Sequence, residues 1–180
     1  MRPIVIPGLL IATAVAMLAP AGSAQAARTP VMDPLGSGTP NGSITLPNNR
    51  CAFSVKIGVV TNKEFQDVTT LADGTTITKI TGNLVLSFTN VETSKAIVRN
   101  VSGPTTETDH FDAQGNFTGG TFVGLGPSWF GFGPISQGNT GEPGLVFTSG
   151  LATLGLGPHG VTSFSLNGTQ KNGCTLLAAP

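Results

Sequence analysis

The sequence has little charge, no tyrosine, one tryptophan and two cysteines. Only 10% of its 180 residues are charged, and the formal net charge is zero. A neutral chain lacks the basic field that attracts nucleic acids or anionic membrane surfaces, so neither is expected as a partner. Intrinsic disorder typically needs high net charge and few apolar residues, whereas 39% of this chain is hydrophobic. The length then fits one folded domain.

The one long apolar stretch lies at the start of the chain and resembles an export signal. Arg2 supplies the positive end, Ile4–Leu18 the apolar run, and Ala24-Gln25-Ala26 an A-x-A cleavage pattern. The run is too short for a membrane anchor, and Pro7 interrupts it. The sequence therefore predicts a signal peptide over residues 1–26 and a mature protein that is soluble, secreted and extracellular, with no membrane span.

The two cysteines, Cys51 and Cys174, lie near the two ends of the chain that follows. A redox pair usually has the closer C-x-x-C spacing, and a metal site needs more ligands than two thiols. In an oxidising compartment such a pair is typical of a structural disulfide. We therefore predict a Cys51–Cys174 disulfide.

The chain changes character at Cys51. Residues 27–50 are rich in Pro, Gly, Ser and Asn, which predicts a flexible lead-in with one short strand at Ser43–Leu46. Residues 51–180 alternate apolar and polar side chains, as half-buried strands do. They are expected to form a single β domain.

Turns and internal glycines indicate the architecture of that domain. Asp73-Gly74, Asp112–Asn116 and Pro158-His159-Gly160 have the composition of tight turns, and softer turns are expected at Asn90–Lys95 and 133–144. Long sequential strands form an antiparallel meander, and their internal glycines favour bends. The expected fold is all-β, a meander closing into an up-and-down barrel of about eight strands, with a two-sheet β-sandwich as the alternative.

Three segments carry a resemblance to a known group of proteins. They are TGNLVLSFTNVETSKAIVRNVSGP (81–104), GEPGLVFTSG (141–150) and NGCTLLA (172–178). Over roughly residues 51–178 the chain resembles small secreted β-rich proteins of actinomycetes, which are high-GC Gram-positive bacteria. Ser94-Lys95 stands where that group more usually has a Gly-Lys turn. The resemblance implies secretion and a β-rich fold, and it brings no known activity or catalytic residue.

The densest group of ionisable residues is ETDHFDAQGN (107–116). In a strand, Glu107 and Asp109 face one way while His110 and Asp112 face the other, so neither face offers the three ligands of a metal site. The segment therefore reads as a strand entering a turn. Glu107 and Asp109 are the candidates for general acid–base catalysis, provided that they face an enclosed space.

Other motifs are weaker. Two interpretations are open for Trp129, Phe130 and Phe132. They pack in the core, with Phe130 on the opposite face from Trp129, or they bind a sugar or an apolar ligand near a barrel mouth. GLGPHG (155–160) matches a dinucleotide fingerprint in its glycines alone, because a strand rather than a helix follows it. No cofactor and no metal is expected. N-x-S/T sequences begin at Asn41, Asn100, Asn116 and Asn167.

These observations leave three functions open. The first is a non-catalytic secreted protein that binds a small apolar ligand or a cell-envelope partner. The second is an isomerase-like or cyclase-like enzyme that acts on a hydrophobic substrate. The third is a purely structural secreted protein with a filled interior. An interior cavity that holds Glu107 or Asp109 would favour the enzyme, an empty apolar cavity would favour a carrier, and a solid core would exclude both.

Overall fold

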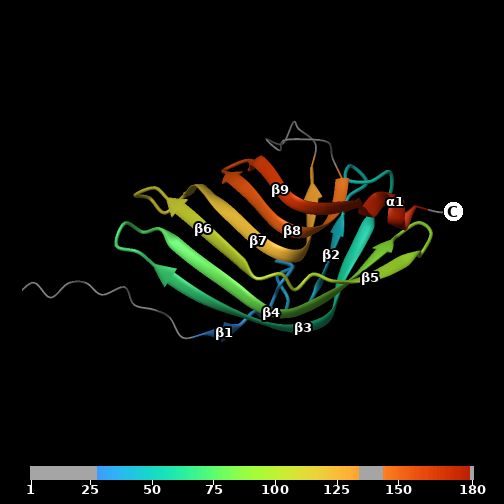
Figure 1. The fold of residues 1–180 in the computed structure, drawn as a ribbon, viewed down its shortest axis with the longest axis horizontal. Coiled ribbons are helices and arrows are strands. Elements are labelled where there is room, and N and C mark those ends of the chain that lie inside the picture. Colours follow the sequence, from blue (N-terminus) through green and yellow to red (C-terminus); the bar gives the residue numbers. More distant parts are fainter. Residues whose placement is uncertain (1–27, 134–143, 179–180) are drawn as a thin grey trace, which may run out of the picture.

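The computed structural model describes residues 28–133 and 144–178, which form one antiparallel sheet and one short helix. Along the sheet the order is β1-β3-β4-β6-β7-β8-β9, with β2 also paired to β3 and β5 also paired to β4 (Figure 1). The elements are β1 (Thr29–Pro30), β2 (Ser43–Leu46), β3 (Val55–Thr70), β4 (Thr76–Asn90), β5 (Ala96–Asn100), β6 (Thr105–Phe111), β7 (Phe117–Phe132), β8 (Gly144–Gly157), β9 (Gly160–Asn172) and α1 (Gly173–Leu177).

The turns between these strands use the residues that tight turns require. Gly74 and Gly115 adopt positive φ angles of 85° and 82°, which L-residues with a Cβ rarely take. The β4–β5 turn places Ser94 at φ 59°, so a serine occupies a left-handed position that glycine takes without strain. The predicted turns at 73–74, 112–116, 158–160 and 90–95 are confirmed. The turn expected at 133–144 falls almost wholly outside the described residues.

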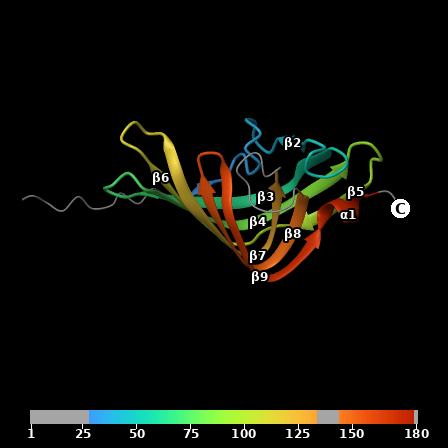
Figure 2. The same cartoon turned by 90° about the horizontal axis from the view of Figure 1, so that it is seen from above.

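Three glycines form a row across the middle of β7, β8 and β9. Gly126 pairs with Gly150, and Gly150 pairs with Gly168. A Cβ on Gly150 would overlap the carbonyl oxygen of Asn167, and one on Gly168 would overlap that of Ser149. The backbones therefore approach more closely here than side chains would allow, and the three strands bend together along this line (Figure 2).

The bend is sharp enough to bring distant residues of one strand together. Phe122 and Phe130 lie eight positions apart in β7, which corresponds to about 26 Å in an extended strand. Their ring centroids are nevertheless only 5.7 Å apart. The sheet thus folds over on itself at the glycine row and encloses apolar side chains within the fold.

The other half of the sheet carries a β-bulge. The pairing of β3 with β4 shifts between Val59 and Thr61, which leaves Val60 as an extra and 55% exposed residue. An extra residue reverses the alternation of every side chain beyond it. Val55 and Ile57 therefore face the core before the bulge, whereas Glu64 and Gln66 face the same way after it.

The expected closure into an eight-stranded barrel is not seen, because within the described residues the sheet remains open. β9 pairs with β8 alone, and the outer edge of β3 is occupied by β1 and β2. A barrel would require β9 to pair with that edge. The alternative of two separate sheets is not seen either, since the described strands form one continuous sheet. The all-β antiparallel class is confirmed.

Two apolar clusters hold the folded sheet together. The larger joins β3 and β4 to β8, and Phe88 lies at its centre, with its ring 5.6 Å from Trp129 and 4.7 Å from Phe147 in edge-to-face geometry. The smaller lies on the opposite face of β7 and β8 and contains Phe130 and Phe132. Rings at these separations add attraction beyond the burial of their surface.

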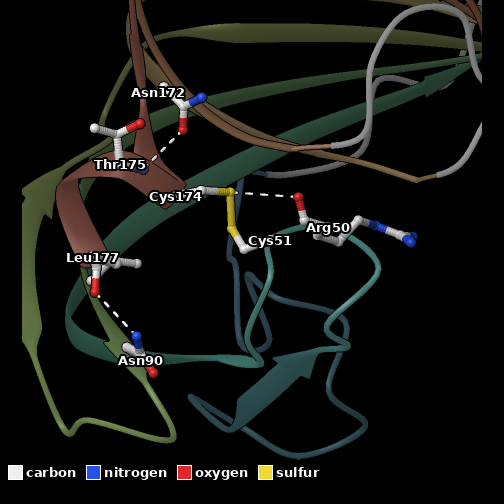
Figure 3. Close-up of a disulfide and its surroundings, with 7 residues drawn as sticks. All are labelled: Arg50, Cys51, Asn90, Asn172, Cys174, Thr175 and Leu177. Carbon is white, nitrogen blue, oxygen red and sulfur yellow. Dashed lines mark hydrogen bonds between the residues drawn. A yellow bond between two sulfur atoms is a disulfide. The ribbon is translucent and has the colours of Figure 1, made fainter. Parts of the chain in front are cut away.

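The sulfur atoms of Cys51 and Cys174 lie at bonding distance, as predicted, with their Cα atoms 5.4 Å apart. Figure 3 shows how this disulfide fixes α1 to the segment that leads into β3. The side chain of Asn172 caps the helix by accepting from the backbone N–H of Thr175, at 3.0 Å. Asn90, which is buried, donates to the carbonyl oxygen of Leu177 at 3.1 Å.

Candidate functional site

A cavity of about 440 Å³ lies inside the bent sheet and is partly open to solvent. This volume falls within the range of about 300–1,000 Å³ typical of small-molecule sites. Ten of its sixteen lining residues are apolar. The lining comprises Val31, Asp33, Pro34, Glu64, Gln66, Ile80, Leu84, Val101, Thr105, Glu107, Phe122, Ser128, Trp129, Phe130, Leu154 and Leu156.

The N-terminal segment helps to build this cavity. The backbone N–H of Val31 donates to the carbonyl oxygen of Glu64 at 3.0 Å, which continues the pairing of β1 with β3. Val31, Asp33 and Pro34 thereby reach the cavity wall. The short strand expected at Ser43–Leu46 is confirmed as β2.

Glu64 is the most buried charged side chain of the cavity, with 8% of its surface exposed. Burial raises the pKa of its carboxyl group. Within the described part of the chain its carboxyl group has no hydrogen-bond or ion-pair partner. Glu64 was not predicted from the sequence, because simple alternation places it on the outer face and the bulge at Val60 reverses that alternation. The one signal was the break in alternation at Val59-Val60.

Glu107 lines the same cavity from β6, as the sequence suggested for an inward-facing acid. Burial raises the pKa of its carboxyl group, and the negative charge of Asp109 raises it further. Asp109 shares the face but lies nearer the β6–β7 turn and does not line the cavity. Of the two candidate acids, the structure therefore places Glu107 alone at the cavity.

The third acidic residue of the lining, Asp33, already has partners. Its two carboxylate oxygens accept hydrogen bonds from the hydroxyl of Ser37 at 3.0 Å and from the backbone N–H of Gly38 at 2.7 Å. Hydrogen bonds from the backbone of Ser37, and then from Gly38, lower the pKa of Asp33. Asp33 thus remains a carboxylate that stabilises its own loop.

His110 and Asp112 take no part in the cavity, as the alternation argument predicted. His110 is exposed, and its Nδ1 lies 3.2 Å from the hydroxyl of Thr75. Asp112 accepts hydrogen bonds from the backbone N–H groups of Gln114 and Asn116, so it organises the turn. A second bulge lies opposite, at Thr118 of β7, where the pairing with His110 and Phe111 shifts by one residue. Phe111 is 41% exposed and packs against Phe117 rather than inside the fold.

The three aromatic candidates divide between core and cavity. Trp129 and Phe130 lie on opposite faces of β7, in different apolar clusters, yet both reach the cavity at the bend. Phe132 packs against Phe130 and Phe164 and does not line the cavity. Core packing therefore describes all three residues, and two of them also contribute cavity wall.

The remaining motifs contribute no site. Residues 155–160 form the end of β8 and the turn into β9, which is a strand, so they cannot hold a dinucleotide at a helix N-terminus. The described residues contain no cluster of three or more potential metal ligands. Within the same ranges no helix is long and apolar enough to cross a membrane.

The chain was compared with protein-family models, curated proteins and solved structures. No protein-family model, no curated protein and no solved structure matches this chain.

Proposed function

We propose that this chain is an exported, non-catalytic protein that binds one small, largely apolar molecule in the cavity of its bent sheet. The observation that carries the proposal is the partly open cavity of about 440 Å³ with a mainly apolar lining. Protein interiors are otherwise packed nearly as densely as organic crystals, so a hollow of this size is an exception to ordinary core packing. A purely structural protein has no need of it.

The disulfide supports the extracellular part of the proposal. Paired cysteines persist in oxidising compartments and are rare in the cytosol. The export signal proposed for residues 1–26 falls on residues that the structure does not describe. The resemblance to secreted actinomycete proteins points the same way, and we propose membership of that group on the sequence segments given above.

The proposal is tested by recovering the protein from culture medium and analysing it by native mass spectrometry. A bound molecule should appear as an added mass that is lost on unfolding. Binding of Nile red, a neutral apolar dye, should report the empty cavity by a rise in fluorescence. Recovery without any added mass, together with no dye response, would rule out a binding protein.

A matched pair of variants locates the binding. Ile80 lines the cavity, whereas Ile77 lies on the opposite face of the same strand. Ile80→Trp should fill the cavity and weaken dye binding at least tenfold, and Ile77→Trp should leave it unchanged. Equal effects of the two substitutions would show that the dye binds elsewhere.

An isomerase or cyclase is the second candidate, and Glu107 favours it, since a carboxyl group with a raised pKa beside an apolar cavity suits general acid–base catalysis. An enzyme of this kind exchanges carbon-bound protons of its substrate with solvent, whereas a carrier does not. If Glu107 moves protons on a bound molecule, transfer to D₂O should add deuterium at carbon positions of the co-purified compound, and Glu107→Gln should abolish that gain. A carrier leaves the compound's mass unchanged.

A further inference from the structure

The charged residues that line the cavity are all acidic. They are Asp33, Glu64 and Glu107, and none of the sixteen lining residues is Lys, Arg or His. Asp33 is already satisfied by its own loop. Two carboxyl groups therefore face an apolar space without a positive charge supplied by the described part of the protein.

Only 8% of the surface of Glu64 is exposed, and none of the described residues hydrogen-bonds its carboxyl group. Its carboxyl oxygens are not among the fully buried atoms without a partner, so they face the partly open cavity. Buried carboxyl groups are normally hydrogen-bonded or paired, because removing them from water without compensation is costly. Lys63 precedes Glu64 in β3 and therefore points to the other face of the sheet. Arg28 bonds the hydroxyl of Thr81 at 3.1 Å and stacks 4.6 Å from the ring centre of Phe65. No described residue thus pairs with Glu64 as a counter-ion.

The two unpartnered carboxyl groups are also well separated. Glu64 pairs with Gly82 of β4, and Glu107 pairs with Thr78 on the other side of the same strand. Four residues along a strand correspond to about 13 Å, so one small cationic group cannot contact both. Glu64, the more buried of the two, is the stronger anchor.

We propose that the ligand of this cavity is a hydrophobic amine, an apolar body whose ammonium group pairs with the carboxylate of Glu64. The inference rests on the proposed binding function and specifies its ligand class. An ammonium group supplies the missing positive charge and donates hydrogen bonds to the carboxylate oxygens, and such charge-assisted bonds are roughly twice as strong as neutral ones. The rings of Phe122 and Trp129 in the wall provide the apolar surface and also attract cations.

The proposal predicts how the affinity for an amine changes with pH. Burial raises the pKa of the Glu64 carboxyl group, so this group takes up a proton at a higher pH than an exposed glutamate does. Pairing with an ammonium ion requires the carboxylate, so binding releases that proton to the buffer. Affinity for an amine should consequently fall as the pH is lowered through the titration of Glu64, whereas affinity for a ligand that accepts a hydrogen bond from the neutral carboxyl group should rise.

The test uses one aromatic body with three head groups. The disulfide-intact chain is titrated calorimetrically at pH 7.5 with 1-naphthylmethylamine, 1-naphthalenemethanol and 1-naphthoic acid. We expect the amine to bind at least tenfold more tightly than the alcohol and the carboxylate to bind least. The amine's affinity should decrease on acidification from pH 7.5 to pH 5.

Glu64→Gln should remove the amine's advantage and leave the alcohol's affinity within twofold of its original value. The control is Glu92→Gln, an exposed glutamate in the β4–β5 turn, which should change neither affinity. If Glu64→Gln does not fold, the head-group and pH comparisons on the unaltered protein still decide the matter.

Equal binding of amine and alcohol, or tighter amine binding at lower pH, would overturn the amine inference while leaving a binding protein intact. Failure of all three compounds and of Nile red to bind would instead overturn the proposed function itself.

Discussion

Removing the disulfide should cost this protein most of its stability. Cys51 and Cys174 are 123 positions apart, and closing a loop of that length stabilises the fold by about 5 kcal/mol at 25 °C in the chain-entropy model. The total stability of a domain is typically only about 5–15 kcal/mol. A Cys51→Ser/Cys174→Ser double variant is therefore expected to be marginally folded. Both cysteines are replaced because a single substitution would leave a free thiol.

The noncovalent contacts around the disulfide should survive this change. Asn90 still donates to the carbonyl oxygen of Leu177, and Asn172 still caps α1. The loss should therefore come mainly from a freer unfolded chain rather than from an undocked helix. Denaturant unfolding followed by circular dichroism distinguishes the two, because a freer unfolded chain exposes more surface and so increases the dependence of unfolding free energy on denaturant.

The control is the unaltered protein after reduction and alkylation, which should match the double variant in midpoint. A loss of under about 1 kcal/mol would refute the loop-entropy account, since that account gives about 5 kcal/mol. So would a large loss accompanied by selective hydrogen exchange of α1 in the native state, because it would assign the disulfide a docking role instead.

Two further predictions concern the bend and the cavity. Gly150→Ala places a Cβ against the carbonyl oxygen of Asn167, at a residue whose φ is 125°. It should therefore destabilise the fold by more than the roughly 1–3 kcal/mol that backbone strain alone costs. Gly115→Ala, at φ 82°, places its Cβ in open space and should cost only that backbone strain. Thermal unfolding of both variants checks this, and an equal loss would contradict a close-packed crease. The pKa values of Glu64 and Glu107 are raised above the ordinary glutamate value of 4.5, so at pH values just above 4.5 the folded state binds more protons than the unfolded state. The free energy of unfolding should therefore decline as the pH rises through this range. Urea midpoints between pH 4 and pH 8 should show this decline and its reduction in Glu64→Gln, and an unchanged slope in that variant would refute it.

Local patterns in the sequence predicted local structure well. Alternation placed Trp129 and Phe130 on opposite faces of one strand, and turn composition located the turns at Gly74 and Gly115. It also separated His110 from Glu107. Each of these features depends on neighbouring residues and on the two-residue period of a strand, both of which are visible in the chain itself.

The cavity could be predicted only in part, because one inserted residue decides which side chains enter it. Without the bulge at Val60, Glu64 would project from the outer face and the cavity would lose its most buried acid. A bulge is set by how two strands align, and that alignment depends on residues of β4 far along the chain. The bulge in the β6–β7 pairing lies at Thr118 of β7, so β6 itself alternates without interruption and simple alternation sufficed for Glu107.

The open sheet also could not be predicted from local sequence patterns, because it depends on how distant strands align. Internal glycines such as Gly150 predicted bending, but bending becomes a fold-over only because Gly126, Gly150 and Gly168 fall in register across three strands. Closure into a barrel would need the outer edge of β3, which the weakly patterned segment before Cys51 covers with β1 and β2 instead. That same segment brings Val31 to the wall beside Glu64. The residues that occupy the outer edge of β3 therefore also complete a cavity that is partly open to solvent.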